Sequence, residues 1–203
     1  TYAGVRIGSI IFLIAGLLAA LAGGFLQANQ FGRRVQPVLN QHAGRLETEV
    51  ILATLDQGRV LLLAQSTTER GTVTYGFTAG AHIPLAHTSL GRMLLACLPQ
   101  DEAEEVLARA EIPQHTEHSL TSRAAIAEQI ELARSQGYAV TDSEFEPGII
   151  GYAVPVSRPG QTPVVAGSSA PRGPEAGQAL PKLLQGLQLC AAELRQTGVV
   201  EDL

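Results

Sequence analysis

A short polar turn before a predicted helix carries the groups best suited to bind a ligand. The stretch PLAHTSLGRMLLA, residues 84–96, is typical of a turn that leads into a helix, with Thr88 and Ser89 at its start and Gly91 in its first turn. The free backbone N–H groups of a helix N-terminus bind anions, and the helix dipole adds to this attraction. The Thr88 and Ser89 hydroxyls could donate to the same anion or simply cap the helix, and both roles can coexist.

Acidic side chains gather in a second segment, at Asp142, Glu144 and Glu146. Paired carboxylates can serve acid–base catalysis or bind a cation. Because no third catalytic group accompanies them, we interpret this cluster as a solvated turn.

Four histidines lie in two short pairs: His82 with His87, and His115 with His118. The second pair has the spacing of metal ligands, but no further Cys, His or Asp completes a tetrahedral set. We therefore predict surface or capping histidines, no metal and no cofactor.

Other side chains with nucleophilic atoms are Ser168, Ser169, Cys97 and Cys190. The serine pair lacks the Gly-x-Ser-x-Gly elbow of hydrolases, so a hydrolase is the weaker alternative and no catalytic residue is predicted. Both cysteines lie in apolar helical patterns, which favours buried free thiols in a reducing, cytoplasmic compartment.

The charge of the chain argues against direct nucleic-acid binding. Its 203 residues carry a net charge of −5 and no Lys/Arg cluster, whereas phosphate binding needs concentrated positive charge. The chain begins at Thr1, so we expect it to be processed or part of a longer protein, with any DNA contact made by a segment that precedes it.

Residues 7–28 form an uncharged apolar run in which small residues recur every four positions. Its length suits a membrane span, while its small-residue stripe suits close pairing of helices. Both interpretations stay open: an interface helix, or the anchor of a membrane-tethered sensor.

The remaining pattern predicts an α+β fold with a mostly antiparallel sheet and helices packed against it. A hairpin is expected around Asp56-Gln57-Gly58, a further strand over 73–77, and later strands near 138–141, 149–156 and 162–170. Helices are expected over 88–98, 101–110 and 182–196, and another that begins at Thr121 or Ser122 as its cap and ends at Gly137.

Three of these segments together resemble the effector-binding domain of the IclR family of bacterial transcription regulators. They are the hairpin TEVILATLDQGRVLLLAQ, the Thr-Ser-x-Gly-Arg turn at 88–92, and GYAVTDSEFEPGIIGYAVPV at 137–156. The resemblance extends from about Leu39 to Leu194, and the Thr-Ser-x-Gly-Arg form is similar to the branch that responds to aromatic acids.

The resemblance implies a curved, GAF-like sheet flanked by helices, with a ligand pocket on its concave side. It implies that residues 1–38 are an apolar linker or interface helix and that residues 39–203 form the effector-binding domain. It further implies a small organic or aromatic acid as effector, a homodimer or homotetramer, and DNA contact only through a winged helix-turn-helix outside this chain.

The same resemblance supplies candidate effector-binding residues. Positions that hold an acid, a cysteine and a serine in some members are Thr141, Gly151 and Gly167 here, which implies a roomier and less polar pocket. The full candidate set is Tyr75, Ile83, Thr88, Ser89, Leu90, Thr141, Gly151, Gly167 and Ser169, with Tyr75 and Ile83 as apolar wall.

Overall fold

The computed structural model describes residues 31–66, 78–174 and 176–198. The chain divides into two compact units, Thr1–Arg34 and Val35–Leu203, and the second unit carries the sheet. The predicted strand over 73–77, with Tyr75, and the apolar run of residues 7–28 lie outside the described residues.

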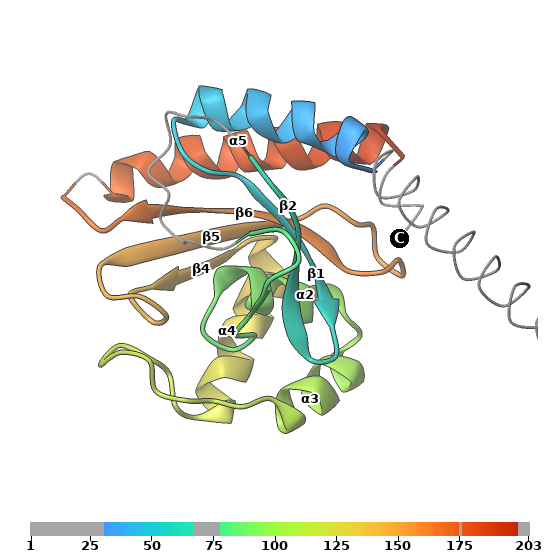
Figure 1. The fold of residues 1–203 in the computed structure, drawn as a ribbon. Helices are drawn as coiled ribbons and strands as arrows, with labels where there is room; N and C mark the ends of the chain where they lie inside the picture. The colour runs from blue at the N-terminus through green and yellow to red at the C-terminus, as the bar shows by residue number, and fades with distance from the viewer. Residues whose placement is uncertain (1–30, 67–77, 175, 199–203) are drawn as a thin grey trace, which may run out of the picture. The chain divides into compact units, whose positions relative to one another are not determined.

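A single antiparallel sheet organises the described part of this unit (Figure 1). Its strand order is β3-β2-β1-β6-β5-β4, so the first and last thirds of the chain meet at the β1–β6 pair. The α+β prediction is confirmed. The strands are β1 Ile51–Asp56, β2 Arg59–Gln65, β3 His82–Ile83, β4 Ala139–Asp142, β5 Ile149–Pro155 and β6 Val164–Pro171.

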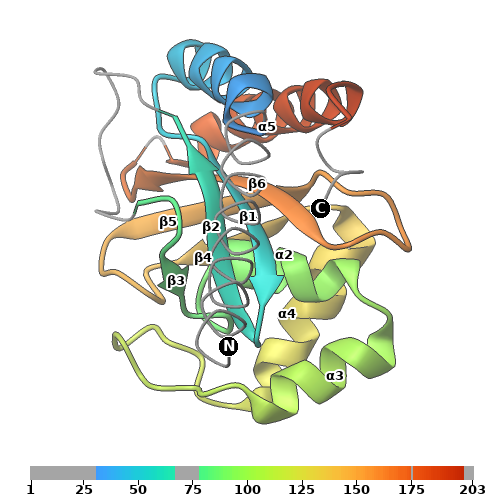
Figure 2. The same ribbon diagram turned by 45° about the vertical axis from the view of Figure 1, so that its right-hand side comes forward.

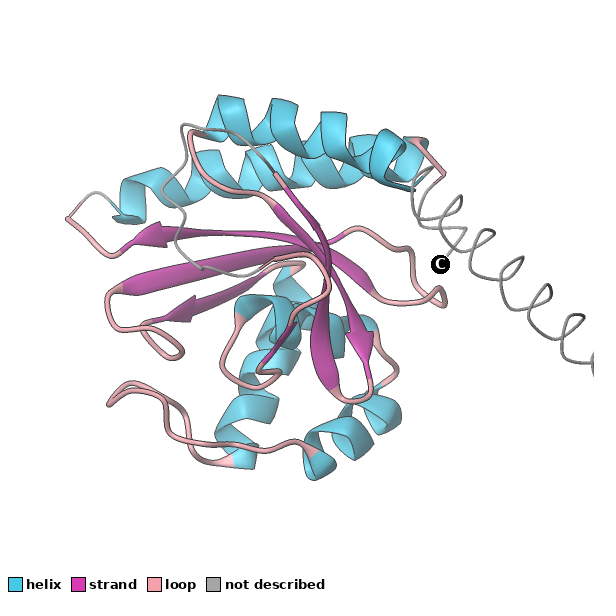
Figure 3. Cartoon of the chain, viewed as in Figure 1, coloured by secondary structure: helices cyan, strands magenta, loops and turns pink. Residues whose placement is uncertain are grey.

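Helices cover both faces of the sheet, as Figures 2 and 3 show. The helix that ends at residue 46 and α5 lie side by side on one face, and the other three pack on the opposite face. The helices after the first are α2 Ser89–Cys97, α3 Gln100–Arg109, α4 Arg123–Gln136 and α5 Ala176–Gln196.

Several predicted boundaries follow local chemistry. Gln57 and Gly58 both have positive φ, 48° and 73°, which is the geometry of the tightest hairpin turns, and they join β1 to β2. Gly137 ends α4 in the left-handed region at φ 77°. The capping prediction for α4 is wrong in one respect, because Ser122 stands at the N-cap position but its side chain makes no capping hydrogen bond. The closing helix also starts earlier than residue 182, at Ala176.

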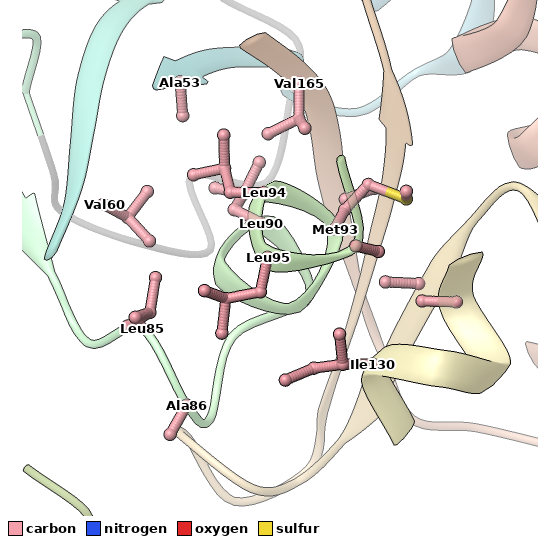
Figure 4. Close-up of a cluster of buried hydrophobic side chains, with 14 of the residues drawn as sticks. Ala53, Val60, Leu85, Ala86, Leu90, Met93, Leu94, Leu95, Ile130 and Val165 are labelled. Carbon is pink, nitrogen blue, oxygen red and sulfur yellow. The ribbon is translucent and has the colours of Figure 1, made fainter. Parts of the chain in front are cut away.

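Helix α2 is the centre of the core on its face of the sheet. It contacts five strands as well as α3 and α4, and its residues from Ser89 to Ala96 are all buried. Figure 4 shows Leu90 and Leu94 of this helix near Ala53 and Val165 of the sheet. Most of these residues are apolar, as a helix buried on several sides requires, and this placement brings the N-terminus of α2 against the sheet.

Candidate functional site

The turn before α2 is held by a cap. Thr88 Oγ1 accepts a hydrogen bond from the Gly91 N–H at 3.1 Å and donates to the Pro84 carbonyl at 2.8 Å. The capping interpretation is therefore confirmed for Thr88. Since that hydroxyl already has two partners inside the turn, Ser89 is the hydroxyl of this turn that remains for a ligand.

Three predicted residues form a row across neighbouring strands. Gly151 of β5 is in register with Thr141 of β4 on one side and with Ser169 of β6 on the other. Directly opposed residues of a sheet point to the same face. The row therefore presents one glycine between two hydroxyl side chains.

Helix α2 approaches this row at Gly151. A Cβ atom at Gly151 would lie 2.9 Å from both Ser89 Oγ and Thr141 Oγ1. The two hydroxyls, from α2 and β4, therefore converge closely over Gly151, and the row faces the N-terminus of α2.

Gly167 lies directly under Leu90 of α2. A Cβ atom there would lie 2.5 Å from Leu90 Cδ2 and 2.8 Å from the Tyr152 carbonyl oxygen. A residue larger than glycine at this position would therefore displace Leu90.

The structure thus brings together Ser89, Leu90, Thr141, Gly151, Gly167 and Ser169. It places Ile83 elsewhere: that side chain belongs to β3, at the opposite edge of the sheet from β4, and is buried in the core cluster.

Ser169 and its neighbour Glu49 carry atoms that no described group satisfies. Ser169 Oγ and Glu49 Oε2 are both buried without a hydrogen-bond partner, and their residues are 2% and 6% exposed. The sequence interpretation missed Glu49. The sequence does contain an indication of it. Glu49 is two positions before Ile51, and side chains two residues apart lie on the same face of a strand.

Burial raises the pKa of Glu49 from 4.5 to about 7. Between these values the folded state binds more protons than the unfolded state, so the carboxyl lowers stability as the pH rises through this window. Glu49→Gln should therefore gain stability over the wild type by about 2 kcal/mol between about pH 5 and about pH 8.

Urea unfolding of both proteins at several pH values measures this difference. Glu117→Gln, at an exposed carboxyl, is the matched control and should keep a nearly constant offset. A stability gap at Glu49 that does not widen with pH would contradict a buried carboxyl with an unpartnered oxygen.

A buried ion pair ties α2 to the β4–β5 turn. Arg92 Nη1 and Nη2 donate to the two Glu144 carboxylate oxygens at 2.7 and 2.5 Å, and Arg92 Nε donates to the Ala86 carbonyl at 3.0 Å. Glu144 is 8% exposed, so its interpretation as part of a solvated turn is wrong, while Asp142 is exposed as that interpretation requires. The reason is a charged partner 52 residues away, which local patterns do not reveal.

The histidine interpretation is also wrong for His87, which is fully buried. One of its ring nitrogens, Nε2, lies 2.8 Å from the Leu120 carbonyl oxygen, and its ring stands edge-on to His115 at 5.1 Å. Partial burial, with His87 nearby, lowers the pKa of His115. Within the described ranges no group of three His, Cys, Asp or Glu side chains could hold a metal ion.

The groups with nucleophilic atoms are engaged elsewhere or inactive. Ser168 Oγ donates to the Glu49 carbonyl at 2.6 Å. Cys97 and Cys190 are free thiols, and burial raises their pKa values to about 11 and about 12. At neutral pH both are therefore thiols rather than the thiolate that acts as a nucleophile.

The described helices include none that combines the length and the apolar character needed to cross a bilayer. Cavities of 600 and 460 Å³ open away from the row, one beside Gln57 and Pro84 and the other beside Cys97 and Arg158.

A curved antiparallel sheet with a buried polar row under a helix N-terminus defines a small-molecule-binding domain. The chain belongs to the IclR family, because residues 25–195 match the family model described as the C-terminal domain of the bacterial transcriptional regulator IclR. The resemblance found in the sequence is thereby confirmed, and the chain is an effector-binding domain of this family.

Known proteins agree with this assignment. The Pca regulon regulatory protein of Pseudomonas putida is 29% identical over 136 residues, which are 67% of this chain and 47% of that protein. The chain therefore spans about half the length of this curated relative.

Two solved structures share the fold. The first is an IclR homolog from Microbacterium hydrocarbonoxydans, complexed with 4-hydroxybenzoate. It has a TM-score of 0.69 at 22% identity, and the match covers 83% of this chain and 70% of the homolog. The second is a double mutant of the PobR inducer-binding domain from Acinetobacter, complexed with 3-hydroxybenzoic acid. It has a TM-score of 0.70 at 23% identity, and the match covers 79% of this chain and 95% of the PobR chain.

Proposed function

We propose that this chain binds a small organic acid, in particular an aromatic acid, and transmits its binding to a DNA-binding segment outside the chain. The domain acts as a ligand sensor and oligomerisation unit of a transcription regulator in the cytoplasm, and it is not an enzyme. The row of Thr141, Gly151 and Ser169 beneath Ser89 carries the proposal, because it offers a buried hydroxyl without a partner next to a helix N-terminus.

An anion fits this place for physical reasons. The α2 N-terminus supplies backbone N–H groups and the positive end of a helix dipole. Ser89, Thr141 and Ser169 supply hydroxyls that can donate to a carboxylate. The buried apolar side chains around Leu90 suit an aromatic ring better than a small polar acid. The aromatic acids bound to the two structural neighbours support the same class of ligand.

Transmission requires that the acid bind two arrangements of the subunits with different affinity. Helix α2 is suited to report occupancy, since it contacts most of the sheet and, through Arg92, the turn that leads into β5.

Calorimetric titration tests the proposal. We expect benzoate, 4-hydroxybenzoate or 3-hydroxybenzoate to bind more tightly than pyruvate or glyoxylate. Ser169→Ala should weaken aromatic-acid binding by about 5- to 10-fold, the value of one hydrogen bond. Gly151→Val should abolish it, because its side chain would displace the hydroxyls of Ser89 and Thr141.

Ser135→Ala on the exposed face of α4 is the control and should bind as the wild type does. Thermal unfolding of each variant shows whether it is folded. Failure of every acid to bind the folded wild-type chain would overturn the proposed function.

A further inference from the structure

Two of the buried polar atoms that lack partners lie on neighbouring chain segments. Ser169 Oγ belongs to β6 and Glu49 Oε2 to the residues just before β1. The proposed function uses Ser169 but leaves Glu49 unexplained. A buried carboxyl without a partner destabilises a fold, so its presence calls for a group that satisfies it.

The register places Glu49 beside the effector row. Ile51 pairs with Gly167 at the end of the antiparallel β1–β6 ladder. Continued by two residues, the same register would set Glu49 opposite Ser169. The segments stay together there, because Thr48 Oγ1 donates to the Ser169 carbonyl at 2.8 Å and Ser168 Oγ donates to the Glu49 carbonyl at 2.6 Å.

The alternation of side chains along a strand indicates on which face of the sheet Glu49 lies. Ile51 and Ala53 belong to the core cluster that contains Leu90 of α2. Side chains two residues apart point to the same side of a strand. Glu49 therefore lies on the side of the sheet that faces α2, at the end of the row Thr141, Gly151, Ser169.

The length of the row restricts the ligand. From Gly151, where Ser89 approaches, to Glu49 the row crosses two inter-strand spacings, about 10 Å. A benzene ring with a carboxylate at one end and a polar group at the other is of this length. Above about pH 8 Glu49 is ionised. The ligand group at that end is then a hydrogen-bond donor, because a carboxylate only accepts and would repel a second negative charge.

We propose that Glu49 forms the far end of the effector site and selects aromatic acids that carry a hydroxyl or amino group opposite their carboxylate. This inference rests on the proposed function. Glu49 accepts a hydrogen bond from the ring substituent, while Ser89 and the α2 N-terminus hold the carboxylate. Dicarboxylates of the same length, such as terephthalate, are rejected.

Titration of the folded chain with matched acids tests Glu49. We expect the wild type to bind 4-hydroxybenzoate at least about 10-fold more tightly than benzoate, and terephthalate more weakly than either. In Glu49→Leu, of similar size but without an acceptor, the preference for 4-hydroxybenzoate should fall to within about 2-fold while benzoate binding persists. Glu117→Gln removes an exposed charge and should leave the preference unchanged.

Glu49→Gln keeps an acceptor in the same shape and provides a second variant if Glu49→Leu does not fold. It should retain part of the preference for the hydroxyl. If wild type and folded Glu49 variants bind both acids with the same ratio, the role of Glu49 is overturned and the proposed function stands. If neither acid binds the wild type, both fall.

Discussion

Glu144→Ala should lower the free energy of unfolding by about 3–5 kcal/mol, the usual effect of removing one partner from a buried ion pair. The variant leaves the Arg92 guanidinium, 1% exposed, without its counter-charge. It also leaves two of the guanidinium nitrogens without their acceptors. Urea unfolding at neutral pH measures the change.

The matched control is Glu105→Ala. Glu105 pairs with Arg109 one helical turn away on the exposed face of α3, and exposed pairs of this kind contribute less than about 1 kcal/mol. A loss at Glu144 no larger than the loss at Glu105 would refute the buried pair. The double variant Arg92→Met/Glu144→Leu should be more stable than Glu144→Ala, because it leaves no charge behind.

This pair also bears on the site. Arg92 lies in the first turn of α2, while Glu144 lies in the turn between β4 and β5, the strands that carry Thr141 and Gly151. Loss of the pair should therefore weaken aromatic-acid binding as well, even in variants that remain folded.

Gly91→Ala should be the other severely damaging substitution, with a loss of at least about 3 kcal/mol. A Cβ atom at this position would lie 2.0 Å from the Leu85 carbonyl oxygen and 2.6 Å from its carbonyl carbon. Both are backbone atoms of the turn before α2, so no side chain can rotate away. The start of the helix must move outward, and Ser89 moves with it.

Gly44→Ala is the control for Gly91→Ala. A Cβ atom at Gly44 meets no other atom within 4 Å, and the residue lies in a helix where alanine is favoured over glycine by up to about 1 kcal/mol. Thermal unfolding should show opposite signs for the two variants. Equal melting temperatures for Gly91→Ala and the wild type would mean that the turn and α2 are not in contact.

Much of the fold could be predicted because its signals are local. The turn at Gln57-Gly58, the cap at Thr88 and the left-handed Gly137 each act within a few residues. The order of these segments also identified the family, and with it the α2 N-terminus and the strands that carry Thr141, Gly151 and Ser169.

The errors at Glu144 and His87 share one cause, which is a partner far away in the chain. Glu144 and His87 are polar residues in polar segments, so local patterns place them in solvent. Arg92 neutralises Glu144 across 52 residues, and the Leu120 carbonyl lies beside His87 Nε2 across 33 residues. Burial of such groups depends on pairings that a short window of sequence does not contain.

Residue patterns alone predicted the α+β class, the family and a helix N-terminus suited to an acid. The groups that face this helix could be found only from the tertiary contacts. The sheet register sets Ser169 beside Gly151, and its continuation sets Glu49 beside Ser169. Tertiary packing also sets Leu90 directly over Gly167. Register across the β1–β6 pair joins residues more than a hundred positions apart. Hydrogen bonds between these two segments, rather than any local pattern, therefore bring the backbone of Glu49 next to Ser168 and Ser169.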